Sequence, residues 1–399
     1  MSAPQETRRI IVAVCLRYYL PGYKSGGPVR TIANLVEHLG DEFDFRIVAS
    51  DRDIHDARPY TGIVQDAWHQ VGKCQVFYAS PWTQTLAGIS RVLNAIDYDV
   101  LYVNSFFDSR FTILPLVARR LGMLRRRPVI VAPRGEFAES ALGIRSWKKV
   151  PFRMAARLAG LYSGVTWHAS SEFEKADIRR RMGSRAATAT RIAVNLPKPR
   201  DAADTVVWQP RAPGDPLRVV FLSRVAPMKN LDFALQVVAE SPVPLRFDIY
   251  GMVDDEAYWA RCRAMLARMP GHVRVAYHGH LPPEQVGPTL AAYDVLFLPT
   301  QGENYGHVIA ESLTHGTPVL ISDRTPWRGL QQTGVGWDLP LDDSGHEFRS
   351  SLETLAGMDA DALLRMRQAA TRYSVERLGA PEAVHANRAL LTEAARQRR

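Results

Sequence analysis

Six short runs of apolar residues without polar alternation constrain the fold of this chain most strongly. Each run is four or five residues long, which is typical of strands that helices cover on both faces. Between the runs lie helical patterns, such as Ile32, Leu35, Val36 and Leu39. Alternating strands and helices predict an α/β fold with parallel sheets. The predicted strands are Ile10–Val14, Val100–Val103, Val129–Ala132, Val219–Leu222, Val295–Leu298 and Pro318–Ile321.

The length of 399 residues favours two domains rather than one. A proline-rich stretch at 197–216 interrupts the alternation and reads as a linker. We therefore expect a first α/β domain at 1–196 and a second at 217–375, with 197–216 as the linker between them. The junction between two such domains is a natural place for a cleft.

Composition excludes several protein classes. The chain is 46% hydrophobic and 23% charged, close to the average of globular proteins. No apolar run reaches the roughly 18 residues of a membrane span, and the apolar run after Arg8 and Arg9 is too short for a signal peptide. Three scattered cysteines suit a reducing cytoplasm and form neither a disulfide framework nor a metal cluster.

The two halves of the chain differ in charge. Residues 1–200 hold 30 Lys and Arg against 17 Asp and Glu, whereas residues 201–399 hold 20 against 24, for a net charge of +9. The excess is compatible with a solvated surface, an anionic membrane, a phosphate-bearing acceptor or nucleic acid. Much of it lies in a local cluster: Arg119, Arg120, Arg125, Arg126, Arg127, Arg145, Lys148, Lys149, Arg153 and Arg157.

Two loops that follow predicted strands have the composition of phosphate sites. Gly26 and Gly27 precede a helix that has Pro28 at its start, and glycine lets backbone N–H groups approach an anion at a helix N-terminus. Arg224 and Lys229 lie in a second strand-to-helix loop, where two cations can clamp a diphosphate. Each pattern alone also fits an ordinary loop. Asn230 is expected to cap the helix that begins at Leu231.

A third segment carries two carboxylates. Glu303 lies in a loop after a predicted strand, and Glu311 lies in the helix that follows. Carboxylates placed in this way can accept hydrogen bonds from sugar hydroxyls. The spacing alone has a real false-positive risk, because 17 glutamates in 399 residues give about 0.7 chance pairs at any fixed separation.

The three segments together resemble the retaining, nucleotide-sugar-dependent glycosyltransferases of the GT-B type, in their family four. The resemblance covers nearly the whole chain and is strongest from Val219 to Trp327. Val131–Glu136 and Ala141-Leu142 are similar to members that build bacterial surface polysaccharides, including exopolysaccharide and lipopolysaccharide. The family implies two Rossmann-like domains that face a cleft, an acceptor domain at 1–196 and a nucleotide-sugar donor domain at 217–375, with no metal or other cofactor. It also implies that residues 376–399 form a C-terminal helix that packs back on the first domain.

The resemblance also implies roles for residues. Arg224 and Lys229 would hold the donor diphosphate, Glu303 the transferred sugar and Glu311 the ribose. Front-face attack would retain the anomeric configuration, and a diphosphate oxygen would take the acceptor proton. The further donor-binding candidates are Gly26, Gly27, Ser223, Gly251, His280, Leu281, Asn304, Tyr305, Gly306 and Val308, and the acceptor-side candidates are Arg30, Asn104, Ser105, Asp108 and Arg134.

The chain departs from the family pattern at two positions. Many relatives have a histidine in the loop after the Val129–Ala132 strand, near the reacting sugar, where this chain has Arg134. A histidine-assisted step is therefore in doubt. Ser223 stands where the phosphate loop often has glycine, which could add a hydroxyl hydrogen bond.

Other signals are better explained by local structure. Asp51 and Asp53 have the spacing of a metal-binding D-x-D motif, as do Asp97 and Asp99, but we interpret both pairs as turn residues. His278 and His280 lack a third ligand at zinc-site spacing. Ser171 with Glu174 is interpreted as a capping box that opens a helix at Lys175. Asn104, Ser105 and Asp108 also fit an ordinary helix cap.

The sequence thus predicts a metal-independent, retaining hexosyltransferase that uses a UDP- or GDP-sugar and a saccharide acceptor, which we expect to be lipid-linked. We expect a cytoplasmic protein, with its basic first domain in peripheral contact with the anionic inner face of the plasma membrane. A nucleotide-sugar 2-epimerase shares the architecture and stays open as an alternative. A nucleic-acid-binding protein is disfavoured because the basic runs lack aromatic platforms and no recognition motif is present.

Overall fold

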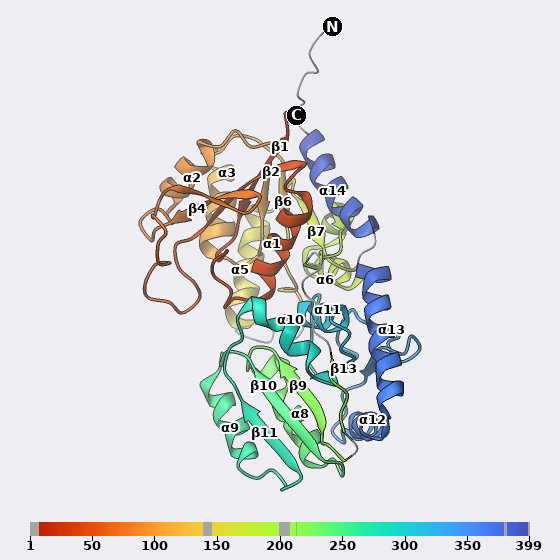
Figure 1. The fold of residues 1–399 in the computed structure, drawn as a ribbon. Coiled ribbons are helices and arrows are strands. Elements are labelled where there is room, and N and C mark those ends of the chain that lie inside the picture. Colours follow the sequence, from red (N-terminus) through yellow and green to blue (C-terminus); the bar gives the residue numbers. More distant parts are fainter. Residues whose placement is uncertain (1–7, 139–145, 199–207, 213, 379–380, 398–399) are drawn as a thin grey trace. The chain divides into compact units, whose positions relative to one another are not determined.

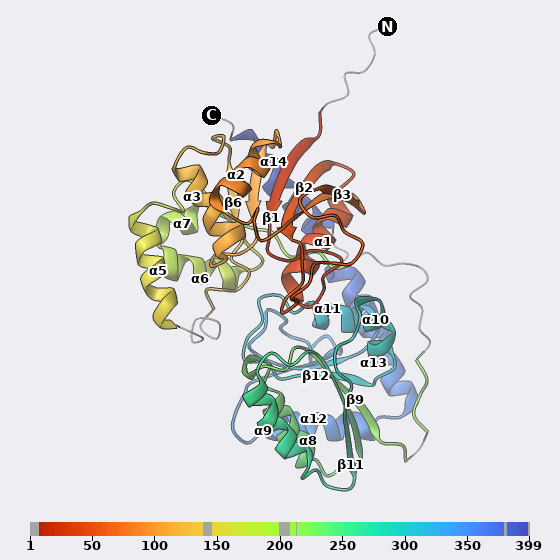
Figure 2. The ribbon, with the colours of Figure 1, turned by 90° about the vertical axis from the view of Figure 1, so that its left-hand side faces the viewer.

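The computed structural model describes residues 8–138, 146–198, 208–212, 214–378 and 381–397. They form two compact units: residues 1–199 with 381–399 are unit 1, and residues 200–380 are unit 2. Each unit is a largely parallel sheet with helices around it (Figures 1 and 2), which confirms the predicted α/β class. In the described ranges no helix combines the length and apolar composition required to cross a bilayer.

Unit 1 has an eight-stranded sheet in the order β3-β4-β2-β1-β5-β6-β7-β8. All neighbouring pairs are parallel except β3 with β4. The order reverses between β1 and β5, so the loops after these strands lie at a switch point of the sheet. The strands are β1 (Ile10–Cys15), β2 (Phe43–Ser50), β3 (Trp68–Val71), β4 (Cys74–Ala79), β5 (Val100–Val103), β6 (Val129–Val131), β7 (Thr166–Ala169) and β8 (Thr190–Ile192).

Helices cover this sheet with two apolar clusters, one on each face. Side chains of β1 alternate between them: Val12 and Val14 belong to one cluster, and Ala13 and Cys15 to the other. A strand buried on both faces has no polar alternation, which explains its continuous apolar sequence. The helices are α1 (Gly27–Leu39), α2 (Leu86–Asn94), η1 (Ser109–Ile113), α3 (Leu114–Arg120), α5 (Ser146–Leu158), α6 (Glu172–Met182), α7 (Ser184–Thr188) and α14 (Pro381–Arg396).

The C-terminal helix α14 belongs to unit 1. Its Asn387 side chain donates to the carbonyl of Val194 over 2.9 Å, and Arg388 pairs with Glu42 at 2.6 Å. Leu390, Leu391 and other side chains of α14 join a core cluster of that unit. The preceding helix α13 (Ala360–Leu378) belongs to unit 2 and runs through residue 375. The predicted boundary at 375/376 therefore falls inside a helix, and the division lies a few residues later.

Unit 2 has a six-stranded parallel sheet in the order β11-β10-β9-β12-β13-β14. Its strands are β9 (Leu217–Leu222), β10 (Leu245–Tyr250), β11 (Val273–Tyr277), β12 (Val295–Leu298), β13 (Val319–Ser322) and β14 (Gly336–Leu339). Its other helices are η2 (Pro227–Lys229), α8 (Leu231–Ala239), α9 (Glu256–Leu266), α10 (Pro283–Ala291), α11 (His307–Thr314) and α12 (His346–Gly357). All six strands predicted across the chain are present, with bounds shifted by at most two residues.

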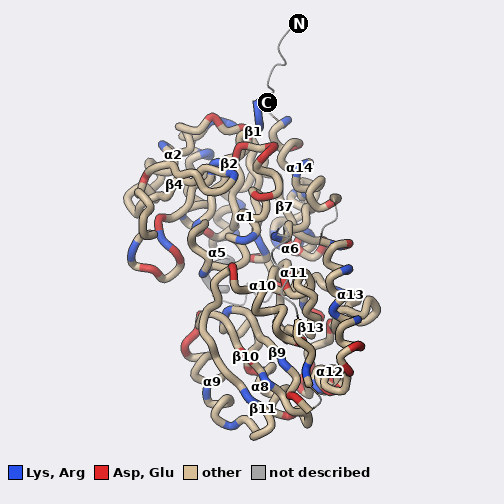
Figure 3. The backbone as a smooth tube through the Cα atoms, viewed as in Figure 1, with Lys and Arg blue, Asp and Glu red and all other residues tan. Residues whose placement is uncertain are grey.

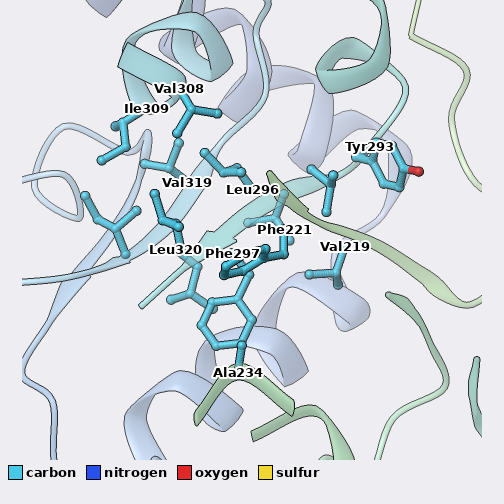
Figure 4. Close-up of a cluster of buried hydrophobic side chains, with 14 of the residues drawn as sticks. Val219, Phe221, Ala234, Tyr293, Leu296, Phe297, Val308, Ile309, Val319 and Leu320 are labelled. Carbon is cyan, nitrogen blue, oxygen red and sulfur yellow. The ribbon is translucent and has the colours of Figure 1, made fainter. Parts of the chain in front are cut away.

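The core of unit 2 fixes the positions of β9, β12 and α11. Phe221 of β9 and Phe297 of β12 are fully buried in one cluster with Ile309 of α11 (Figure 4). Residues 208–212 of the predicted linker are part of this unit, because the Trp208 indole N–H donates to the buried carboxylate of Asp294 over 3.2 Å. The strands that carry the candidate site are thus held by a rigid core.

Candidate active site

In unit 2 the strand order reverses between β9 and β12, which are parallel neighbours. In open α/β sheets, ligands bind beyond the carboxyl ends of the strands at such a switch point. The loops that leave β9 and β12 contain Arg224, Lys229 and Glu303. The fold therefore brings together two of the segments that the sequence analysis selected.

The two cations of the β9 loop both have carboxylate partners. Arg224, whose side chain is 45% exposed, pairs with Asp254. Lys229 is the last residue of η2, is buried and pairs with Glu303, 74 residues later. The Lys229–Glu303 ion pair directly joins the proposed diphosphate clamp to the proposed sugar-binding carboxylate.

Backbone contacts hold these two loops together. The amide of Gln301 donates to the carbonyl of Met228 over 2.8 Å, and the Thr300 hydroxyl donates to the same carbonyl over 3.0 Å. Asn230 precedes α8 in the left-handed conformation, with φ of 60°, and its side chain donates to the carbonyl of Pro299 over 3.0 Å. Asn230 is thus the N-cap residue of α8, as expected, but its side chain makes no capping hydrogen bond, and its amide ties the two loops together instead.

The β12 loop continues into α11 through Asn304, Tyr305 and Gly306. Gly306 is left-handed, with φ of 79°, and precedes a helix whose first turn carries no acidic residue. The positive end of α11 is therefore available to an anion. Within α11, Val308 is buried and Glu311 lies one turn into the helix.

Tyr305 is a buried side chain in this loop. Its ring packs 5.7 Å from that of Trp327, whose indole N–H donates to the Tyr305 carbonyl. Its hydroxyl is buried and has no hydrogen-bond partner among the described residues. Burial, with a smaller contribution from the charge of Glu311, raises the pKa of Tyr305, so the hydroxyl stays protonated and can donate.

Gly251 allows a close backbone approach beside the β9 loop. Its φ is 148°, and a Cβ atom there would lie 1.7 Å from the carbonyl oxygen of Ser223. The Gly251 amide donates to the carbonyl of Gly279 over 2.7 Å, which joins the ends of β10 and β11. His280 and Leu281 follow in the loop before α10. Gly251 and Ser223, which are both donor-binding candidates, thus lie side by side.

His278, which was considered above as a zinc ligand together with His280, contacts a carboxylate of the neighbouring strand. Its Nε2 atom lies 2.7 Å from the buried carboxylate of Asp248, and its ring stacks on Tyr250. The Tyr293 hydroxyl donates to the same carboxylate over 2.8 Å. These contacts fix the end of β11 next to β10.

In unit 1, an aspartate organises the loop that leads to Gly26 and Gly27. The carboxylate of Asp53 accepts hydrogen bonds from the amides of Tyr23 and Lys24, over 2.8 and 3.0 Å. Gly26 is left-handed, with φ of 72°, and α1 begins immediately after it, with no acidic residue in its first turn. Asp53 therefore holds a loop in place, and Arg30 lies in the first turn of α1.

The other D-x-D residues also make local contacts. Asp51 is buried and pairs with Arg52 at 2.8 Å. Asp99 accepts from the amide of Ile11 over 2.9 Å, and Asp97 pairs with Arg125 at 2.8 Å. These carboxylates serve turns and strand ends, as the sequence analysis expected.

Two acceptor-side candidates are engaged in local structure. The Asp108 carboxylate caps η1 by accepting from the amides of Arg110 and Phe111, and it also pairs with Arg17. The Ser105 hydroxyl donates to Glu136 over 2.8 Å. These contacts match the helix-cap interpretation of the segment.

Arg134 and Asn104 form a distinct group at the ends of β6 and β5. The Nε atom of Arg134 donates to Oδ1 of Asn104 over 2.6 Å, and its two Nη atoms donate to Asn195 and to the hydroxyl of Tyr102. Tyr102 in turn lies 2.6 Å from Nδ1 of the buried His168. Burial, and to a lesser extent the charge of Arg134, lowers the pKa of His168 to about 3.

Tyr102, His168 and Asn195 were not predicted from the sequence to surround Arg134. Tyr102 and His168 lie within buried strands, so the sequence gives them the appearance of core residues, and Asn195 lies just before the expected linker. No local motif marks them, because only the order of the sheet brings β5, β6 and β8 together. Asp254, the partner of Arg224, was missed for the same reason.

The capping box at α6 is only partly present. The Ser171 hydroxyl accepts from the amide of Glu174 over 3.2 Å, so Ser171 is the N-cap, but α6 begins at Glu172 rather than at Lys175. The Glu174 carboxylate does not return to the amide of Ser171. It is buried and accepts from the amides of Gly135 and Ser170, each over 2.7 Å. Glu174 thus fixes the loop that carries Arg134.

The predicted basic cluster is partly neutralised. Figure 3 shows Lys and Arg interspersed with Asp and Glu along both units. Arg125 and Arg127 both pair with Asp97, at 2.8 and 3.2 Å. Arg145, Ala141-Leu142 and the side chains of Lys148 and Lys149 lie outside the described residues.

Arg153 and Arg157 of this cluster, both on α5, lie close to Arg181 of α6. Burial and the charges of Arg181 and Arg157 lower the pKa of Arg153. Met154 and Leu158 on the same helix are 61% and 87% exposed. We define a basic and apolar face by these side chains, in which like charges lie beside exposed apolar groups: Arg153, Met154, Arg157, Leu158 and Arg181.

Comparisons with known proteins decide the family. The model of the glycosyl transferases group 1 matches residues 203–335, and that of the glycosyl transferase 4-like domain matches residues 26–195. Together they span three quarters of the chain and contain the Gly26-Gly27, Arg224/Lys229 and Glu303/Glu311 segments. The chain is a group 1, family-four-like glycosyltransferase.

Among curated proteins, this glycosyltransferase is similar to the D-inositol 3-phosphate glycosyltransferase of Xylanimonas cellulosilytica. The two are 27% identical over 206 residues, which are 51% of this chain and 49% of the relative. The chain thus matches about half the length of this relative.

Solved structures share the fold across the whole chain. Anabaena Alr3699/HepE in complex with UDP and glucose has a TM-score of 0.69 at 15% identity, covering 97% of this chain and 100% of that one. WaaG, a glycosyltransferase involved in lipopolysaccharide biosynthesis, has a TM-score of 0.65 at 13% identity, covering 96% and 98%. At such low identity the likeness shows the fold, which confirms the GT-B expectation.

Proposed function

We propose that this glycosyltransferase transfers a hexose-type sugar from a UDP- or GDP-sugar, with retention and without a metal, to a lipid-linked saccharide acceptor of bacterial surface polysaccharide synthesis. The observation that carries the proposal is the Lys229–Glu303 ion pair at the β9/β12 switch point. It joins a cation suited to a diphosphate and a carboxylate suited to sugar hydroxyls. The UDP and glucose bound to the structurally similar HepE support a donor of this class.

In this proposal the donor lies against unit 2. Arg224 and Lys229 stabilise the negative charge that develops on the diphosphate when its bond to the anomeric carbon breaks. The uncapped N-terminus of α11 adds a favourable partial charge. Glu303 accepts from hydroxyls of the transferred sugar, and Glu311 accepts from the ribose hydroxyls.

The chemical step forms the bond between an acceptor oxygen and the anomeric carbon on the face that the diphosphate leaves. The acceptor proton passes to a diphosphate oxygen, so atoms and charge balance without a protein base. His168 is not a candidate base, because it is buried and both its ring nitrogens are engaged, one by Tyr102 and the other by the carbonyl of Ala193 over 2.8 Å.

The proposed membrane contact rests on the basic and apolar face of α5 and α6. Cations beside exposed apolar side chains are the pattern by which a protein lies on an anionic bilayer. We expect binding to vesicles of phosphatidylglycerol and phosphatidylcholine at low salt, and no binding to phosphatidylcholine alone. Arg153→Glu/Arg157→Glu should abolish it.

The matched control for the vesicle experiment is Arg263→Glu/Arg268→Glu, which reverses two exposed arginines of unit 2. If both double variants bind anionic vesicles as the wild type does, the proposed face has no role in membrane contact.

Product analysis tests the reaction class. UDP-hexoses and GDP-hexoses are incubated with the protein in EDTA, with and without a lipid-linked saccharide extract, and products are followed by NMR. The proposal expects transfer that depends on the extract and gives the donor's own anomeric configuration. Release of a 2-epimerised sugar without acceptor would establish the epimerase alternative, and an inverted product would refute the retaining assignment.

A further inference from the structure

Arg134 occupies an unusual backbone position at the carboxyl end of β6. Its φ is 55°, in the left-handed region that side chains other than glycine and asparagine rarely adopt. Such strain persists only where the surroundings enforce it, and it is concentrated at functional sites. The surroundings hold the backbone of Arg134 in this conformation, because the amide of the next residue, Gly135, donates to the buried carboxylate of Glu174.

The guanidinium of Arg134 is fixed by neutral oxygen atoms. Nε donates to Asn104 over 2.6 Å, Nη1 to Oδ1 of Asn195 over 2.7 Å, and Nη2 to the hydroxyl of Tyr102 over 2.5 Å. A guanidinium has five N–H groups, so two remain beyond these three. Arg134 itself is only half-buried.

The hydrogen bonds of this group have a defined direction. Nε2 of His168 faces a carbonyl oxygen, that of Ala193, and therefore donates to it. Nδ1 of the neutral ring then accepts from the Tyr102 hydroxyl, whose oxygen accepts from Arg134. With the pKa of His168 lowered to about 3, the histidine adds no second charge, and Arg134 is the charged member of this network.

The carboxylates nearest in sequence and space are engaged elsewhere. Glu136 accepts from the amides of Phe106 and Phe107 and from the Ser105 hydroxyl. Glu174 accepts from Gly135 and Ser170. Within the described part of the chain, no carboxylate forms an ion pair with Arg134. The guanidinium is thus a pre-positioned cation without a counter-charge.

We infer that Arg134 binds an anionic oxygen group, a phosphate or a carboxylate, on the acceptor saccharide. A guanidinium matches the geometry of both groups through paired N–H bonds. Because three neutral acceptors already fix its orientation, little conformational freedom is lost on binding. The assignment of this anion to an acceptor rests on the proposed function, whereas the anion site itself rests on unit 1 alone.

The experiment compares glucose 6-phosphate, glucuronate and glucose as probes of the full chain by titration calorimetry. All proteins carry Arg224→Ala/Lys229→Ala, so that anion binding at the proposed diphosphate clamp of unit 2 does not contribute to the measured heat. We expect the phosphate or the carboxylate probe to bind at least about tenfold more tightly than glucose. The preferred probe identifies the source of the anion.

Arg134→Gln should remove this preference, and Arg185→Gln, at an exposed arginine of α7, should keep it. Tyr102→Phe is the second variant, because it keeps the charge of Arg134 and removes one of its three anchors. We expect it to reduce the preference by at least about twofold while the sugar phosphate still binds more tightly than glucose. Equal binding of all three probes, or an anion preference that persists in Arg134→Gln, would overturn the inference.

The two proposals fail separately. A wild-type chain that binds no nucleotide sugar, together with an anion preference that depends on Arg134, would refute the proposed function and leave the anion site standing. Nucleotide-sugar binding without that preference would refute only the role of Arg134.

Discussion

Replacement of Lys229 by methionine separates the two roles of the Lys229–Glu303 ion pair. The two side chains are 11% and 15% exposed, so the methionine leaves the Glu303 carboxylate largely buried and without its cation. Breaking a fully buried pair in this way costs about 3–5 kcal/mol. Because some solvent reaches both groups, we expect a loss of about 2 kcal/mol in the free energy of opening of unit 2.

The double variant Lys229→Met/Glu303→Gln removes both charges and should recover at least about 1 kcal/mol relative to the sum of the single variants. Native-state hydrogen exchange, read by mass spectrometry on peptides of α8 and α11, is the suitable assay, because it reports each unit separately. Arg274→Met, at an exposed arginine of β11, is the control and should change little.

Nucleotide binding should respond differently from stability. Every variant without Lys229 loses a charge-assisted bond to the diphosphate, worth about 1.5–3 kcal/mol, which corresponds to an affinity about 10–150-fold lower. The double variant should therefore recover stability but not nucleotide affinity. A coupling energy below about 0.5 kcal/mol, or equal losses in Arg274→Met, would refute the reasoning.

Three other substitutions have expected outcomes. Gly251→Ala should lower the melting temperature of unit 2 in scanning calorimetry, because its Cβ would lie 1.7 Å from the carbonyl oxygen of Ser223. An unchanged melting temperature would contradict this close contact. Glu174→Ala leaves three donors unpaired, of which the amide and hydroxyl of Ser170 are buried, and should cost at least about 2 kcal/mol in the urea unfolding of unit 1, which an equally stable variant would contradict. The pKa of His168 is about 3 in the folded protein and 6.5 in the unfolded chain. As the pH falls below 6.5, the unfolded chain therefore takes up a proton that the folded protein does not, and the free energy of unfolding decreases. Between pH 6 and 5 the wild type should lose about 1.2 kcal/mol more than His168→Gln, and parallel pH profiles would contradict this.

The sequence predicted those parts of the fold that local pattern encodes. β1, β5 and β12 are buried on both faces, so their sequences are continuously apolar and stand out. β10 contains Arg246 and Asp248, which form an ion pair on its polar face, and its sequence gives no comparable signal. β2 and β4 were missed for a similar reason, since polar residues interrupt both.

The candidate site was predictable where one loop carries several functional residues. The loops after β9 and β12 are such segments, and the structure joins them through Lys229 and Glu303. The surroundings of Arg134 were not predictable, because its partners come from β5, from the loop after β5 and from the segment after β8, and they depend on the order of the sheet. Asn230 is the N-cap residue that the sequence predicted, but the bonds of the Asn230 and Glu174 side chains to distant loops were not predictable, since a residue type that suits a cap also suits such a bond.

The most direct test of the central claim is nucleotide binding measured by titration calorimetry in EDTA, with UDP and GDP as ligands. We predict that one of the two binds, that EDTA has no effect, and that Glu311→Ala weakens binding at least about tenfold, whereas Glu353→Ala, at an exposed glutamate of α12, does not. Binding that requires a divalent metal, or that is equal in wild type and Glu311→Ala, would contradict a metal-independent donor site at the carboxyl ends of β9 and β12.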